Sequence, residues 1–170
     1  MDHPAIKILN ANGLMAISTI RPDGWPQTTM VGYANRGFEL LFMIFRSGQK
    51  FANIQQDDRI SIAVAPEPAS INELTAVYAG AHAVEITDPA EQKEAWRLLM
   101  QRHSNLAGFQ MPGAGEVAFM RARCKYVSLL DYSQGPGHRE QFVINDDGSR
   151  TDLAEDTDAW GEDAVRGVTA

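Results

Sequence analysis

The chain has 170 residues, 44% of them hydrophobic, which is enough for one domain with its own core. A single cysteine excludes an internal disulfide and favours a reducing, cytoplasmic environment. The net charge is −7, and residues 145–170 hold eight acidic and two basic residues, so the nearly neutral body lacks the basic face of a nucleic-acid-binding protein. No apolar run approaches the ~18 residues of a membrane span, and the N-terminus lacks the pattern of a signal peptide.

The first half of the sequence predicts a short helix and a three-stranded antiparallel meander. Apolar residues at helical spacing indicate a helix over residues 4–9. Turns at Asp23-Gly24 and Gly37 separate three apolar segments, because these residues suit tight hairpin turns. The expected strands are residues 14–20, 27–34 and 38–45. The last of them is apolar almost throughout, so we expect both of its faces to be covered.

The second half predicts two more helices among further strands. Phe51 and Ile54 are three residues apart, which favours a helix within residues 48–57. Asp88 and Pro89 mark the start of another helix, with the carboxylate as N-cap and proline at the first helical position. The remaining expected strands are residues 59–65, residues 73–86 with a bulge at Gly80, residues 117–131 and residues 140–144.

These elements predict a mainly β fold, with six or seven mostly antiparallel strands in a closed or nearly closed barrel and short flanking helices. The alternative from the pattern alone is a two-layer α+β sheet. We place the barrel in residues 1–144 and an acidic tail in residues 145–170. The tail is either disordered or helical near residues 153–165, and in the second case we expect Trp160 to dock on the barrel or on a partner subunit.

An anion-binding site is predicted where the third strand meets the second helix. Arg46 and Lys50 lie at the start of that helix, although the helix dipole favours acidic residues there. A bound anion would remove this mismatch, because the two bases and the free backbone N–H groups would share it. Ser47 adds a hydroxyl donor, and Gly48 allows close approach of the backbone. The alternative is a solvated loop with incidental bases.

Other kinds of site find little support in the sequence. It contains neither the GxGxxG nor the GxxxxGK[ST] phosphate-binding motif, and no GxSxG sequence supports hydrolysis. The four histidines are far apart and form no HxxxH or HExxH pair, so we expect no metal site. Cys124 lies within an expected strand and is expected to be a small buried hydrophobe.

Several short motifs follow one another along the chain in a recognisable order. They are an LAT-like strand at residues 16–19, a DGxP turn at 23–26, a strand at 28–33, Lys50 with Asn53-Ile54, a D-x-R-x-S sequence at 57–61, and segments at 77–80 and 128–138. In this order they resemble the FMN-binding split-barrel family of pyridoxamine 5'-phosphate oxidase-like proteins. The resemblance covers roughly residues 5–144 and implies a six- to seven-stranded antiparallel split β-barrel.

The resemblance also implies which residues meet FMN, in a homodimer with the flavin at the subunit interface. Lys50, Gln49 and Ser47 would contact the phosphate, and Arg46 is the candidate for the charge that the oxidases carry as arginine where this chain has Gln49. The residues expected along the isoalloxazine ring are Met43 and Ile44 of the third strand with Thr28, Thr29 and Val31 of the second. Thr75 falls where the oxidases have a flavin-contacting glutamine.

The expected function is that of an FMN-dependent oxidoreductase acting on an unidentified small molecule. Oxidation of pyridoxamine phosphate itself is disfavoured, because the late Arg-x-His motif of the oxidases is broken by Pro136, two residues before His138. A missing acid–base constellation does not argue against an enzyme, since the flavin carries the hydride chemistry. The alternatives are a flavin-binding or sensing module without turnover, and a deazaflavin- or haem-binding relative of the same fold.

Overall fold

The computed structural model describes residues 3–106 and 108–153 of the chain. Within these residues the strands are β1 (Leu14–Ile20), β2 (Pro26–Arg36), β3 (Glu39–Phe45), β4 (Arg59–Val64), β5 (Thr75–Glu85), β6 (Val117–Asp131), β7 (Arg139–Ile144) and β8 (Arg150–Asp152). The helices are α1 (Pro4–Ala11), α2 (Gln49–Gln56) and α3 (Pro89–Arg102), with 3₁₀ turns at Ile71–Glu73, Ser104–Leu106 and Tyr132–Gln134.

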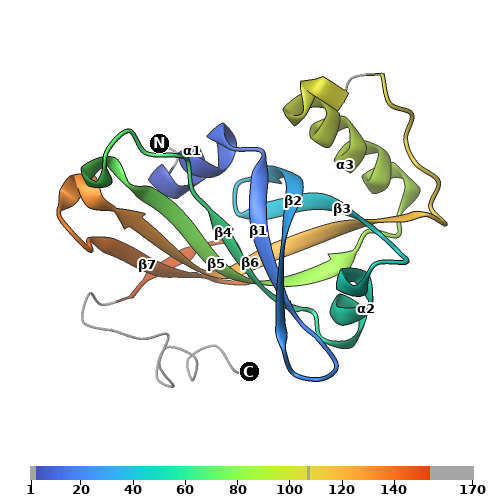
Figure 1. The fold of residues 1–170 in the computed structure, drawn as a ribbon, viewed down its shortest axis with the longest axis horizontal. Coiled ribbons are helices and arrows are strands. Elements are labelled where there is room, and N and C mark those ends of the chain that lie inside the picture. Colours follow the sequence, from blue (N-terminus) through green and yellow to red (C-terminus); the bar gives the residue numbers. More distant parts are fainter. Residues whose placement is uncertain (1–2, 107, 154–170) are drawn as a thin grey trace.

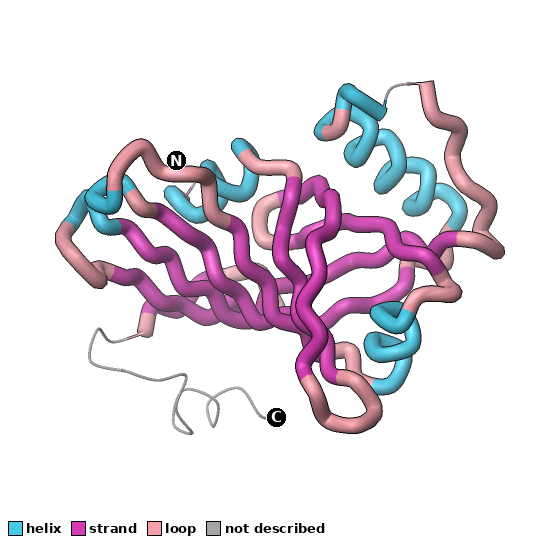
Figure 2. The backbone as a smooth tube through the Cα atoms, in the orientation of Figure 1, coloured by secondary structure: helices cyan, strands magenta, loops and turns pink. Residues whose placement is uncertain are grey.

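The strands form one antiparallel sheet in the order β3-β2-β1-β4-β5-β6-β7-β8. An additional pairing between β3 and β6 closes the first six strands into a barrel, and β7 and β8 extend the sheet beyond it (Figure 1). Figure 2 shows the helices at the margins of this sheet, as expected for short flanking elements. The predicted mainly β barrel is therefore confirmed, and the two-layer alternative is not what the chain forms.

The barrel interior is filled by the alternate residues of its strands, as the period of two requires. In β1, for instance, Met15, Ile17 and Thr19 are buried, whereas Leu14 and Ile20 point outward. Helix α1 adds Ala5 and Leu9 to the same core. The hydroxyl of buried Tyr33 donates to the backbone carbonyl of Leu9 (2.8 Å), which ties the end of α1 to β2.

Strand β3 is covered on both faces along most of its length, as predicted. Leu40 and Phe42 point into the barrel, and Leu41 packs outward in a second apolar cluster with Phe119 of β6 and Leu99 of α3. The cover on the outer side therefore comes from helix α3 of the same chain. The prediction fails at the end of the strand, where Phe45 is 70% exposed because β3 runs past α3 towards α2.

Two local predictions are confirmed. The Asp88 carboxylate accepts from the Glu91 backbone N–H (2.8 Å) and caps α3. The register between β5 and β6 shifts after Gly80, and a Cβ at this position would lie 2.1 Å from Cε2 of the Tyr126 ring. Glycine is required there because the tyrosine ring lies across the backbone of β5.

Strand β2 leaves its neighbour β3 halfway along. It pairs with β1 from Pro26 to Gly32, but with β3 only from Tyr33 to Arg36. The rest of β3 pairs with β6 instead. Within the described chain, residues 26–32 of β2 therefore have no strand on their second side, so backbone groups of this edge are free to pair with something else.

The segment predicted to be an acidic tail begins inside the sheet. Residues 150–152 form β8, which pairs with Phe142, Val143 and Ile144 of β7. The Leu153 backbone N–H donates to the Gln141 carbonyl (2.8 Å). The expected helix near residues 153–165 and the docking of Trp160 lie outside the described residues.

Candidate functional site

Helix α2 packs against β1 and β3, and its residue Asn53 reaches Gln27 in the part of β2 that has an open edge. Its N-cap is Gly48, which offers no side-chain acceptor, and its first turn contains no acidic residue. The first backbone N–H groups of a helix have no partner within the helix and carry a partial positive charge. The start of α2 therefore has the free N–H groups and the missing acidic residues on which the predicted anion site depends, and the anion itself stays a prediction.

A buried amide fixes this helix start against the β1–β2 hairpin. Asn53 is fully buried, and its Nδ2 donates to Thr19 Oγ1 of β1 (2.9 Å) and to Gln27 Oε1 of β2 (3.1 Å). Its Oδ1 accepts from Nε2 of Gln49 (2.9 Å). The network joins α2 to the two strands next to the open edge, so the site is positioned by side chains from three elements.

Lys50 is a cation without a charged partner among the described residues. Its side chain is half-buried, and burial lowers the pKa of its ammonium below the usual range. No carboxylate or other acceptor of the described chain makes an ion pair or hydrogen bond with it, although a desolvated ammonium is costly without one. An anion bound at the start of α2 would supply the missing partner.

Arg46 has a different partner from the one the sequence suggested. Its guanidinium forms an ion pair with Glu85 at the end of β5, and its Nε donates to the Ala114 carbonyl (2.6 Å). It also lies over the Phe51 ring, 5.2 Å from the centroid. The Glu85 carboxylate therefore neutralises this charge, and Arg46 links α2 to β5 and to the segment before β6.

Gln49 and Ser47, the other two residues expected at the phosphate, lie at the N-terminal end of α2. Gln49 is exposed and its amide nitrogen is occupied by Asn53. Ser47 is exposed immediately before the N-cap, and no side-chain hydrogen bond of Ser47 is formed within the described chain. Lys50, Gln49 and Ser47 are thus brought together, whereas Arg46 is drawn towards Glu85.

The residues expected along the isoalloxazine ring are divided between the two faces of the sheet. Val31 and Ile44 belong to the barrel core, while Met43 packs in the cluster under α3. Thr28 is exposed on the outer face, where its hydroxyl bonds to Ser18 Oγ (2.7 Å). Because neighbouring residues of a strand point to opposite faces, these side chains cannot all meet one ring.

Thr29 carries an unsatisfied polar atom at the open edge of β2. Its Oγ1 is buried and has no hydrogen-bond partner. Thr29 lies opposite core residue Ile17 and two residues after Gln27, the strand residue that the α2 amide network holds. Because Thr29 shares the inward face with Ile17, this hydroxyl is enclosed by the barrel, and a ligand at the open edge would meet the backbone groups of β2 instead.

Thr75 lies far from this site within the chain. It begins β5, while Glu85, the partner of Arg46, ends the same strand ten residues later. At about 3.3 Å per residue the two positions are about 33 Å apart. Any contact of Thr75 with the cofactor would therefore have to involve a different copy of the chain.

The residues that sequence reasoning missed are those that act through long-range pairs: Glu85, Asn53, Thr19 and Gln27. The sequence marks Asn53 as part of a family motif but does not show its hydrogen-bond partners. Its position on the inner face of α2 is the signal that could indicate a buried amide. Glu85 carried no signal, because its partner is 39 residues away in the sequence.

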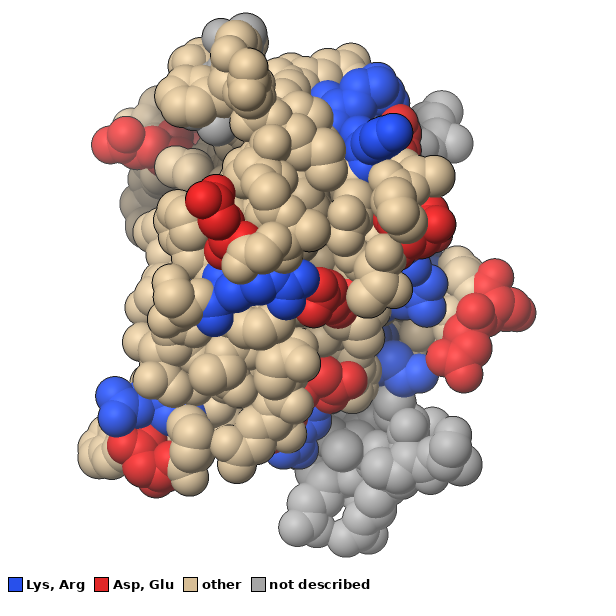
Figure 3. Space-filling view, turned by 90° about the vertical axis from the view of Figure 1, so that its right-hand side faces the viewer, with Lys and Arg blue, Asp and Glu red and all other residues tan. Residues whose placement is uncertain are grey.

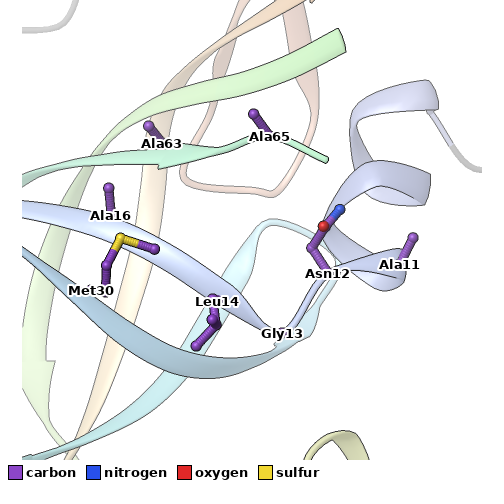
Figure 4. A pocket seen from close by; sticks show the side chains of 8 residues that line it. All are labelled: Ala11, Asn12, Gly13, Leu14, Ala16, Met30, Ala63 and Ala65. Carbon is purple, nitrogen blue, oxygen red and sulfur yellow. The ribbon is translucent and has the colours of Figure 1, made fainter. Parts of the chain in front are cut away.

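A hollow of about 540 Å³ lies on the outer face of the barrel. Figure 4 shows small side chains around it, with Ala16 of β1, Met30 of β2 and Ala63 of β4 on the sheet and Asn12 after the end of α1. Leu14 and Met30 are 59% and 62% exposed there. Ala11 at the end of α1 also lines the hollow, and the exposed Leu14 and Met30 leave this face an apolar surface open to a further molecule.

Charge elsewhere on the molecule is largely paired. Figure 3 shows the face that carries α2 and α3, where blue basic side chains lie beside red acidic ones instead of forming a continuous basic field. Among the described residues no group of three or more His, Cys, Asp or Glu could hold a metal ion. Likewise, none of the described helices has the length and apolarity needed to cross a membrane.

Comparison with solved structures supports the fold. A haem-binding protein from Mycobacterium smegmatis superposes with a TM-score of 0.69 at 15% identity, over 84% of this chain and 59% of that chain. An FAD-binding protein from Mesorhizobium loti gives 0.59 at 21%, over 74% and 90%, and an F420 reductase gives 0.59 at 19%, over 75% and 98%. This chain therefore spans less than two thirds of the haem-binding protein, and the identities establish the fold alone.

The sequence itself carries a stronger finding. No curated protein matches it, but residues 2–131 match the family described as pyridoxamine 5'-phosphate oxidase. The match spans the barrel from the N-terminal helix to the end of β6, including the start of α2, the open edge of β2 and the Asn53 network between them. The chain belongs to the pyridoxamine 5'-phosphate oxidase family.

Proposed function

We propose that this protein binds FMN between the start of α2 and the open edge of β2, and that it is an oxidoreductase acting on a small molecule. The observation that carries the proposal is Lys50, a half-buried ammonium without a partner in the described chain, next to an uncapped helix N-terminus. The phosphate of FMN supplies the charge that both features lack. The free backbone groups of β2 residues 26–32 support a ligand that extends from the phosphate along the strand edge.

The bound flavin would supply the hydride chemistry, and the chain would supply position and exclusion of water. Lys50 and the α2 backbone N–H groups would hold the phosphate. The Asn53 network would keep α2 at a set distance from β2, so that the strand edge can contact the rest of the cofactor. An enzyme of this kind needs no dedicated acid–base pair in the chain.

We further propose that the chain forms a homodimer in the cytoplasm through the outer face of β1, β2 and β4. Leu14 and Met30 are more than half exposed on this face, around a hollow that small residues such as Ala16 and Ala63 also line. The apolar third strand does not contribute to this interface, because α3 of the same chain covers its outer face. Light scattering should give twice the 18.7 kDa mass of one chain. Met30→Asp should shift it towards a monomer, and the same change at Ile71, exposed on a distant 3₁₀ turn, should not.

The experiment for the cofactor compares Lys50→Ala with Lys93→Ala, an exposed lysine of α3. Flavin fluorescence titration should show FMN binding weakened by about 1.5–3 kcal/mol in the first variant, the range for a charge-assisted hydrogen bond, and unchanged binding in the second. Equal binding by wild type and Lys50→Ala, with folding intact by circular dichroism, would remove Lys50 from the site.

A second candidate is a deazaflavin- or haem-binding protein, and neighbours of the same fold are described by those names. The ion pair of Arg46 with Glu85 favours a cofactor whose phosphate is less charged than that of FMN. A deazaflavin attached through a phosphodiester would be such a cofactor, because a phosphodiester carries less charge than a phosphate monoester. The absorption spectrum of purified protein separates flavin, deazaflavin and haem. NADH or NADPH consumption with candidate acceptors then separates an enzyme from a flavin-binding or sensing module without turnover.

A further inference from the structure

The ion pair between Arg46 and Glu85 lies beside the proposed phosphate site but belongs to no role assigned so far. Arg46 precedes Lys50 by four residues, and its guanidinium lies over the ring of Phe51, the next residue along α2. Both members of the pair are largely shielded from solvent, with side chains 30% and 19% exposed. A charge held at this place acts on the start of α2 with less screening than an exposed one.

Both carboxylate oxygens of Glu85 accept from the Arg46 guanidinium. One oxygen pairs with Nη2 and the other lies 3.4 Å from Nη1, while Nε is committed to the Ala114 carbonyl at 2.6 Å. The guanidinium is therefore held by three bonds in a direction set by β5 and by residue 114. The sum of the two charges is zero, so within residues 3–106 and 108–153 the start of α2 keeps one uncompensated cation, Lys50.

We infer that Glu85 is a specificity-determining residue, which sets how strongly the site favours a doubly charged phosphate over a less charged or uncharged ligand. The inference rests on the proposed flavin site at α2. A phosphate monoester carries a charge of about −1.5 to −2 at neutral pH, so each unit of positive charge near α2 strengthens its binding more than that of a phosphodiester. Because Glu85 cancels the positive charge of Arg46, it weakens the preference for a phosphate monoester over a phosphodiester. The site then accepts a wider range of flavin nucleotides.

The substitution Glu85→Gln separates charge from geometry. The glutamine amide oxygen can still accept from Arg46, so the link between α2 and β5 is kept, but the pair gains a net positive charge. The probes are riboflavin, which has no phosphate, and FMN. The measured quantity is the ratio of their dissociation constants at low and high salt. A change in the flavin-ring site alters the binding of both ligands, a change at the phosphate alters that of FMN alone, and an effect of charge is weakened by salt.

The expected result for Glu85→Gln is FMN binding about three- to tenfold tighter, riboflavin binding unchanged, and a steeper loss of FMN affinity with added salt. Glu94→Gln is the matched control, because it removes the same charge from an exposed pair with Arg97 on α3 and should leave the ratio unchanged. Adding Arg46→Gln to Glu85→Gln should return the ratio to the wild-type value.

The single variant Arg46→Gln tests the same inference from the other side and covers the case in which Glu85→Gln does not fold. It leaves Glu85 uncompensated, so FMN binding should weaken about three- to tenfold with riboflavin unchanged. An FMN-to-riboflavin ratio within about twofold of wild type in the folded variants would overturn the role of Glu85 while leaving the flavin site in place. Absence of binding of both ligands by wild type would instead refute the proposed function, and the selectivity with it.

Discussion

Replacing Asn53 by alanine tests whether the buried amide holds the site together. Asn53 has no exposed surface and takes part in three side-chain hydrogen bonds, with Thr19, Gln27 and Gln49. Each such bond contributes about 0.5–1.5 kcal/mol, and a buried hydroxyl left without a partner, as Thr19 Oγ1 would be, costs about 1–3 kcal/mol more. Because the bond to exposed Gln49 is readily replaced by water, we expect a loss of about 2–4 kcal/mol in the free energy of unfolding.

Urea unfolding followed by circular dichroism measures this loss of free energy. In thermal unfolding, a loss of 1 kcal/mol lowers the melting temperature by about 2–4 °C, so we expect a fall of roughly 4–16 °C. Asn72→Ala, an exposed asparagine of a 3₁₀ turn, is the matched control and should change stability by less than about 0.5 kcal/mol. The flavin titration of Asn53→Ala should also show weaker FMN binding, because α2 is no longer tied to β2. A stability change as small as that of the control would show that the network does not hold α2, and the argument for a pre-positioned site would fail.

Two further predictions concern parts of the fold away from the cofactor. Burial, with a smaller effect of Arg150, lowers the pKa of His3, whose neutral Nδ1 accepts from the Ala5 N–H and caps α1. The unfolded chain therefore takes up a proton at higher pH than the folded one, so the stability that is present above pH ~6.5 should be lost as the pH falls below it. The variant His3→Asn keeps a capping side chain but does not titrate in this range. It should therefore flatten this part of the profile of urea midpoint against pH. Gly80→Ala should lower the free energy of unfolding by about 1–3 kcal/mol, because the new Cβ would lie 2.1 Å from the Tyr126 ring. Urea unfolding of the double variant with Tyr126→Ala tests this reason: if removing the ring recovers none of the loss, the steric explanation is wrong.

Local features of this protein could be read from the sequence because their causes are local. Alternating apolar residues fix which face of β1 is buried, Asp88 caps α3 through its own side chain, and glycine at position 80 signals the irregularity in the β5–β6 pairing. The start of α2 was recognisable for the same reason, since a basic, uncapped helix N-terminus is a property of a few consecutive residues. The family motifs add the order of strands, and with it the barrel.

Tertiary structure alone decided what each of these features contacts. The sequence shows that β3 is apolar on both faces, but only packing reveals that α3 supplies the outer cover and that Phe45 lies beyond it. Arg46 and Lys50 look equivalent in the sequence, yet one is cancelled by Glu85 from the far end of β5 and the other is left without a partner. The physical reason is that periodicity and capping act over a few residues, whereas ion pairing and burial depend on which distant segments the closed barrel brings together.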